Sequence, residues 1–195
     1  MTTTDGTLPV GDSAAKFYES VWPLAGLVMR LATLVVPDHA QAEELAHQTL
    51  LEAARTIDRR GEADWRMWVL GILHKRRREQ LQNAGVAPVL ADDRWTPAPP
   101  SQSETIAADP KEVLASLSDE QVLMAIRALP EETRWAVLLL DVVAMPESHA
   151  AVVLDLPVWT IESHAKQAHQ VLRDVLVPLA AVVNSARQNQ VFERR

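Results

Sequence analysis

Apolar residues in this chain recur at intervals of three and four positions, and this periodicity limits its fold more than any other feature. Between about residues 14 and 35 they mark one face of a helix. Asp38 is an expected N-cap for a second helix that ends near Ile57, and a third helix is predicted from about 64 to 81. The two-residue alternation typical of strands is almost absent. We therefore predict an all-α fold.

The helical pattern stops between Asn83 and Pro110, a segment that contains five of the twelve prolines. Small and polar residues fill the rest of this segment, which is typical of a semi-extended tether. We predict two small helical domains joined by a flexible Pro-rich linker. The predicted boundaries are 14–82 for the first domain, 83–111 for the linker, 112–177 for the second domain and 178–195 for a C-terminal tail.

The second domain contains signals for four helices. Ser118 with Gln121 forms a capping-box signature, and Pro130 ends the helix that follows. The segments EETRWAVLLLDVV and PESHAAVVL are predicted to form two more helices, and VWTIESHAKQAHQVLRDVL a fourth after a short turn. This order predicts a helix-turn-helix domain, and the tail can continue the last helix with a kink at Pro178.

Composition excludes several classes of protein. There is no cysteine, so disulfides and thiolate metal sites are excluded. The N-terminus lacks the pattern of a signal peptide, and the most apolar run is interrupted by Asp141. We expect a cytoplasmic protein without membrane insertion. Because the net charge is −7, binding to nucleic acid requires a local basic patch.

One such patch closes the third predicted helix, where HKRRRE places four cations in a row: Lys75, Arg76, Arg77 and Arg78. Cations are also common at helix C-termini, where they oppose the helix dipole. The upstream residues Trp65 and Trp68 favour a second interpretation, because aromatic faces beside cations suit single-stranded DNA. Both tryptophans can equally belong to the core.

The predicted last helix has the opposite character. On the side expected to be exposed, Lys166 is the only fixed positive charge, beside Glu162, His164 and His169. Between Glu112 and Pro178 there are four Lys and Arg against ten Asp and Glu, a net charge of −6. Each lost phosphate contact weakens DNA affinity, so this domain alone should bind DNA poorly.

Four segments resemble the two-domain extracytoplasmic-function sigma factors in order and approximate spacing: QAEELAHQTLLEAARTID, ADWRMWVLGILHKRRRE, AIRALPEETRWAVLLLDVV and LDLPVWTIESHAKQAHQVL. The resemblance covers most of residues 14–177. Thr160 and Ser163 match the core of the family's recognition helix. Trp159 and Glu162 depart from it, because the family has glycine and lysine there.

The resemblance implies three sets of site residues. Those expected to dock on core RNA polymerase are Glu44, His47 and Gln48. Those expected to open and hold the −10 promoter element are Arg60, Trp65, Trp68, Lys75, Arg76, Arg77 and Arg78. Those expected to read the −35 element are Thr160, Ser163, His164, Lys166 and Gln167.

Two functions remain open on this basis. The first is a sigma factor that directs core RNA polymerase to promoter DNA, with an anti-sigma factor as a further partner. The second is a degenerate sigma-like module that binds a sigma-factor partner without reading DNA. An enzyme is not expected, because the six histidines show no metal-ligand pattern and no Gly-rich phosphate loop is present. We predict no metal, cofactor or catalytic residue.

Overall fold

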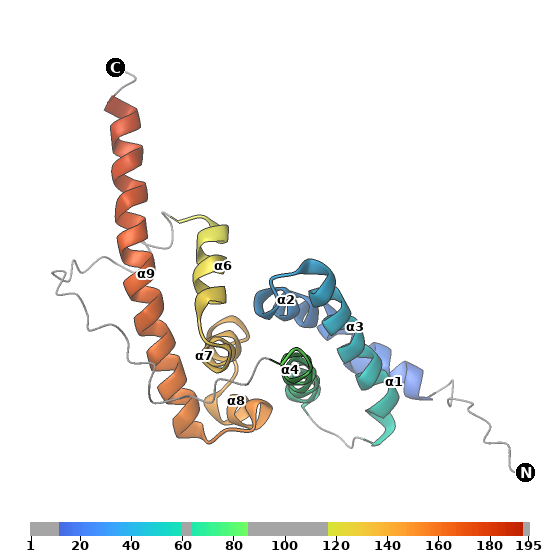
Figure 1. Cartoon of the computed structure of the whole chain (residues 1–195). Coiled ribbons are helices and arrows are strands. Elements are labelled where there is room, and N and C mark those ends of the chain that lie inside the picture. Colours follow the sequence, from blue (N-terminus) through green and yellow to red (C-terminus); the bar gives the residue numbers. More distant parts are fainter. Residues whose placement is uncertain (1–11, 60–63, 86–116, 193–195) are drawn as a thin grey trace, which may run out of the picture. The chain divides into compact units, whose positions relative to one another are not determined.

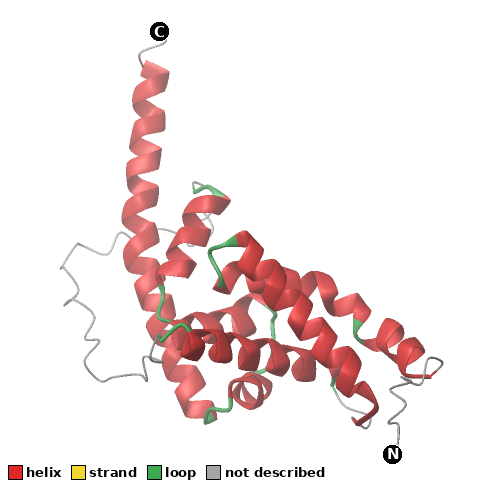
Figure 2. Cartoon of the chain, turned by 45° about the vertical axis from the view of Figure 1, so that its right-hand side comes forward, coloured by secondary structure: helices red, strands yellow, loops and turns green. Residues whose placement is uncertain are grey.

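The structure is a computed structural model that describes residues 12–59, 64–85 and 117–192. All regular structure in these ranges is helical, as Figures 1 and 2 show, so the predicted all-α class is confirmed. The chain divides into two compact units. The first comprises Met1–Pro88 with Ser148–Leu156, and the second comprises Val89–Glu147 with Pro157–Arg195. The predicted linker lies outside the described residues except for positions 83–85.

The first unit begins with three short elements where the sequence predicts one helix. These are α1 (Asp12–Ser20), the 3-10 helix η1 (Trp22–Leu24) and α2 (Ala25–Val35). The prediction of a continuous helix is wrong, because Pro23 lacks an N–H and its ring would clash with the preceding turn. The core side of α2 consists of Val28, Leu31, Ala32 and Val35.

Helix α3 (His39–Thr56) begins where the sequence predicts. The carboxylate of Asp38 accepts a hydrogen bond of 2.8 Å from the backbone N–H of Gln41, which confirms the predicted N-cap. Helix α3 contacts both α2 and α4, and the short helix η2 (Ile57–Arg59) follows it. Its buried residues are Ala42, Leu45, Ala46, Thr49 and Ala53.

Helix α4 (Trp65–Asn83) is capped by Asp64, whose Oδ1 accepts from the backbone N–H groups of Arg66 and Met67 at 3.0 and 3.2 Å. This start agrees with the predicted third helix. The side facing the core consists of Val69, Leu70, Ile72, Leu73 and His74. Within the described ranges no helix is both long enough and apolar enough to span a bilayer.

The second unit contains α6 (Asp119–Ala128), α7 (Glu131–Val137) and the π-helical turn η3 (Leu138–Val142). The capping box before α6 is confirmed. The Ser118 N–H donates to Gln121 Oε1 at 2.9 Å, and the Gln121 N–H donates to Ser118 Oγ at 3.3 Å. Helix α6 ends before Pro130, as predicted, and α7 packs against the last helix.

Helix α8 (Glu147–Leu154) and helix α9 (Val158–Phe192) are separated by the predicted short turn. Helix α9 runs past the residue-177 boundary and through Pro178, so the tail extends the helix. Ala180, beyond that proline, is buried with Ala125 of α6. The last helix is therefore longer than a recognition helix requires, and part of its extension packs within the second unit.

Among the described residues, two other than glycine have a left-handed backbone, Ala144 with φ of 54° and Asp155 with φ of 55°. They lie in the turns on either side of α8. Aspartate adopts this conformation more readily than most residues, whereas alanine has no side-chain hydrogen bond to offset its steric cost. The turn between α8 and α9 is thus formed without glycine.

Candidate nucleic-acid interface

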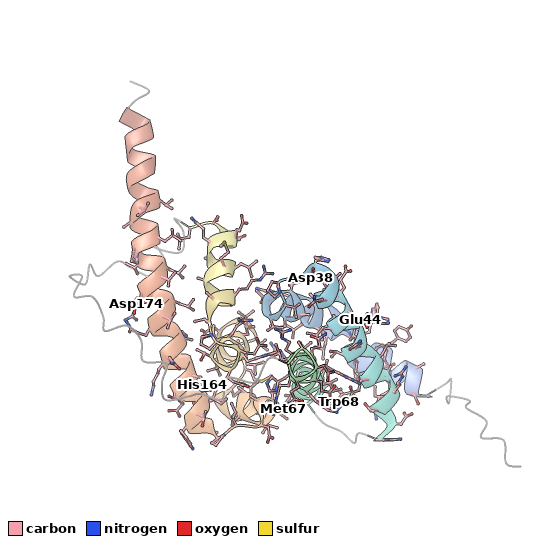
Figure 3. The ribbon with its side chains drawn as sticks, in the orientation of Figure 1. Asp38, Glu44, Met67, Trp68, His164 and Asp174 are labelled. Atoms are coloured by element: carbon pink, nitrogen blue, oxygen red, sulfur yellow. The ribbon has the colours of Figure 1, made fainter. Side chains whose placement is uncertain are left out.

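The exposed face of α3 carries the three residues predicted to bind polymerase. Glu44 and His47 are exposed, and half-buried Gln48 donates through Nε2 to Glu44 Oε1 at 2.5 Å. Figure 3 labels Glu44 on this helix. Leu51, one turn further along, is 38% exposed and was not predicted. The spacing of these four positions marks one helical face, so Leu51 could have been found by extending the pattern by one turn.

Trp65 and Trp68 form an edge-to-face pair with ring centroids 5.6 Å apart and an interplanar angle of 69°. Both side chains are half-buried, so they are neither full members of the core nor fully exposed faces for stacking on DNA bases. Lys16 of α1 places its Nζ 5.2 Å from the ring centroid of Trp65, a cation–π contact that the sequence did not reveal. Arg60, the remaining predicted residue of this region, lies outside the described residues.

Lys75–Arg78 lie in the C-terminal half of α4 before its last turn, and the first two of these cations lie beside two carboxylates. Arg76 forms ion pairs through Nε with Glu52 Oε2 and, at 3.2 Å, through Nη1 with Glu79 Oε2. Lys75 Nζ lies 3.5 Å from Glu52 Oε1 and 3.9 Å from Glu79 Oε1. Lys75 and Arg76 of the predicted positive patch are therefore already paired with carboxylates within the folded chain.

His74 occupies the buried side of α4, next to these cations. Burial, and secondly the charge of Arg78, lowers the pKa of His74 to about 4. The side chain is consequently neutral near pH 7, and it contributes no positive charge to the surface. Among the described residues, no three His, Asp or Glu side chains are arranged to hold a metal ion.

The first turns of α9 carry the residues predicted to read the −35 element. Ser163 and Lys166 are exposed, whereas Thr160 and Gln167 are half-buried. Lys166 Nζ lies 3.8 Å from Glu162 Oε2, so the positive charge is opposed on the same face. Trp159, at the start of the helix, is 72% exposed.

The expectation that His164 lies on the exposed, DNA-facing side of the last helix is wrong, because the residue is only 6% exposed. Figure 3 labels it on α9. Its position completes a buried stripe with Ile161, Ala165 and Ala168, at the i, i+3, i+4 and i+7 spacing of a helical face. Burial also lowers the pKa of His164 below its usual value. The same periodicity, applied to this helix, would have placed His164 inside.

A groove of about 660 Å³ lies beside α9 in the second unit. Its acidic lining consists of Asp141, Glu147 and Glu162, while Leu140, Met145, Pro146 and Ala165 supply apolar surface. His169, which was expected to face solvent, is held by Asp141 through a 2.6 Å contact between Nε2 and Oδ2. Carboxylates at this density repel phosphate, so the groove opposes DNA binding.

Comparison with known proteins places these surfaces in context. No family model matches the chain. The chain is 25% identical over 162 residues to the ECF RNA polymerase sigma-E factor of Haemophilus influenzae, covering 80% of this chain and 82% of the relative. The similarity in sequence therefore extends over most of the length of both chains.

A solved structure has the same fold. It is the sigma factor RpoE from Bartonella quintana, crystallised in complex with the anti-sigma factor NepR. The TM-score is 0.64 with 19% identity, and the match covers 83% of this chain and 96% of that one. The chain is therefore similar in sequence to a protein named as an ECF sigma factor and similar in fold to a solved sigma factor.

Proposed function

We propose that this protein is a sigma factor that directs core RNA polymerase to promoters for the initiation of transcription. The observation that carries the proposal is the collinear likeness to an ECF sigma factor, which extends over 80% of the chain. The role is one of binding rather than catalysis. Since the polymerase and the chromosome lie in the cytoplasm of a bacterial cell, the proposal includes the cytoplasmic location expected from the sequence.

The first unit would supply the polymerase contact and most of the DNA contact. The exposed face of α3, with Glu44, His47 and Gln48, would dock on the core enzyme. Helix α4 would meet the −10 element through half-buried Trp65 and Trp68, whose rings can stack on unpaired bases, and through the cations at its end. This assignment follows the resemblance, and the exposure of the α3 face supports it.

The second unit would make a weaker contact with the −35 element. Thr160, Ser163, Lys166 and Gln167 remain the candidate residues, and His164 is removed from this set. With a net charge of −6 between Glu112 and Pro178, this part of the chain gains little from counterion release. An acidic, weakly DNA-binding second domain is therefore part of the proposal, and so is an anti-sigma factor as a partner.

Reconstitution with purified core RNA polymerase tests the proposal directly. We expect the chain to co-elute with core enzyme and to make it initiate at specific sites in a genomic fragment library, whereas core enzyme alone does not. Co-elution without specific initiation would support a sigma-like interaction module instead. A chain that does not bind core enzyme at all would overturn the proposal.

A further inference from the structure

The C-terminal half of α4 and the facing part of α3 share a closed set of four charges that links the two helices. Each of Lys75 and Arg76 contacts both Glu52 of α3 and Glu79 of α4. The Glu52 side chain is only 18% exposed and that of Arg76 is 34% exposed, whereas Lys75 is 63% exposed. The pair between Glu52 and Arg76 is thus the sheltered centre of the set.

We infer that Glu52, assisted by Glu79, sets the DNA affinity of the first unit by competing with phosphate for Lys75 and Arg76. The inference rests on the proposed function, in which the end of α4 meets promoter DNA. Glu52 lies on α3, so it acts on DNA through the two cations that it holds. Glu52 is therefore a residue that determines DNA affinity without contacting DNA. The main role of Arg76 is to join α3 and α4 through its ion pairs.

The physical reason lies in how DNA affinity depends on salt. A cation contributes to counterion release when it replaces ions condensed on a phosphate, by about 0.9 units of log–log slope per contact on duplex DNA and about 0.7 on single strands. A cation that already has a carboxylate partner must first leave it, and a sheltered pair is screened less by salt than an exposed one. Lys75 and Arg76 should therefore add little to the slope of the wild-type protein.

Glu79 provides a graded comparison. Its side chain is 40% exposed, and it contacts the same two cations at 3.2 and 3.9 Å. An exposed carboxylate competes with phosphate less strongly than a sheltered one, because water and salt screen it. Loss of Glu79 should act in the same direction as loss of Glu52, with a smaller effect.

The test compares Glu52→Gln, Glu79→Gln and the control Glu19→Gln in the full chain. Glu19 is an exposed residue of α1 that forms none of the four ion pairs, and its substitution changes the net charge by the same amount. Fluorescence anisotropy over a salt series would measure affinity for a promoter fragment by the holoenzyme. The same series with a single-stranded oligonucleotide would use the chain without polymerase.

We expect Glu52→Gln to bind both DNA probes more tightly at low salt and to have a steeper slope. For each gained contact with duplex DNA, affinity should fall about threefold further than in the wild type between about 50 and about 200 mM salt. Glu79→Gln should change the slope less, and Glu19→Gln should leave it unchanged. In an Arg76→Gln background the effect of Glu52→Gln should shrink, because one of the released cations is missing.

An unchanged slope in natively folded Glu52→Gln would overturn the inference, and so would an equal gain in Glu19→Gln. If Glu52→Gln fails to fold by circular dichroism, Glu79→Gln decides the question, and an unchanged slope in that variant counts against competition. Core-enzyme binding is measured separately. Failure of the wild-type chain to bind core enzyme would contradict the proposed function. The salt slopes measured with the single-stranded oligonucleotide test the inference without polymerase.

Discussion

The Lys75–Arg78 segment of α4 and the first turns of α9 are the two surfaces where the sequence predicts DNA contact, and they differ in their balance of charge. At α4, Lys75 and Arg76 contact Glu52 and Glu79, and Arg77 and Arg78 follow them in the sequence, so the cations of this segment outnumber these two carboxylates. Beside α9, the groove carboxylates outnumber Lys166, which is itself opposed by Glu162. Both surfaces are helical and partly exposed, so a helix of suitable shape does not by itself define a DNA-binding surface.

The difference in charge balance predicts different contributions of the two units to DNA binding. A surface with excess positive charge gains affinity from counterion release, and a surface with excess negative charge loses it. The first unit should therefore carry most of the DNA affinity as well as polymerase docking. Four experiments would break or sharpen the comparison between the two units.

The double substitution Glu44→Lys with Gln48→Lys should weaken binding to core enzyme at least about tenfold, a loss of roughly 1.4 kcal/mol or more. The new charges lie on the exposed face of α3 and leave its buried side intact. Titration of labelled core enzyme measures the loss. Glu19→Lys with Gln82→Lys is the matched control, because it makes the same changes at exposed positions of α1 and α4. Equal losses in both variants would mean that this face of α3 is not the dock.

Acid should destabilise the first unit through His74. Its pKa is about 4 in the folded chain, against an ordinary histidine value of 6.5, so the unfolded state binds more protons between these values. Stability should fall as the pH drops from about 7 to about 5, by about 2 kcal/mol. Urea unfolding at both pH values measures the change. His74→Gln, which cannot titrate, should flatten this dependence, and an unchanged dependence would contradict the assigned cause.

Arg78→Gln should reduce the salt slope of promoter binding by about one unit, because exposed Arg78 is a candidate phosphate contact. Arg76→Gln should reduce it far less, since Arg76 is held by Glu52 and Glu79. Holoenzyme anisotropy over a salt series compares the two variants. Equal reductions would show that Glu52 and Glu79 do not keep Arg76 from contacting phosphate. No reduction in either variant would show that this segment of α4 does not contact DNA.

Glu147→Lys with Glu162→Lys should raise the affinity of the second unit for duplex DNA several-fold. A charge contact at an exposed surface is worth about 1 kcal/mol, and each substitution replaces a repulsive charge with an attractive one. Anisotropy with duplex DNA measures the gain. Asp119→Lys with Glu120→Lys, at two exposed positions at the start of α6, changes the net charge by the same amount, and an equal gain there would argue against a DNA-facing groove.

Local features of this protein could be predicted from the sequence because they depend on neighbours a few residues apart. Asp38 caps α3 through Gln41, and Ser118 and Gln121 cap α6 reciprocally, each over a separation of three residues. The all-α class follows from apolar spacing in the same way. The break at Pro23 and the burial of His164 were also encoded locally. The proline itself signals the break, and the apolar stripe that includes His164 signals its burial, but the prediction used neither signal.

Contacts between distant parts of the chain were decided only by the tertiary structure. Glu52 precedes Arg76 by 24 residues, Asp141 precedes His169 by 28, and Lys16 reaches Trp65 from a different helix. No sequence periodicity specifies which charge meets which across two packed helices, because this depends on their rotation and register. The sequence by itself determined the helices and the positions of the cations. Only the packing of the helices decided which of those cations have carboxylate partners, and hence how readily each can contact a DNA phosphate.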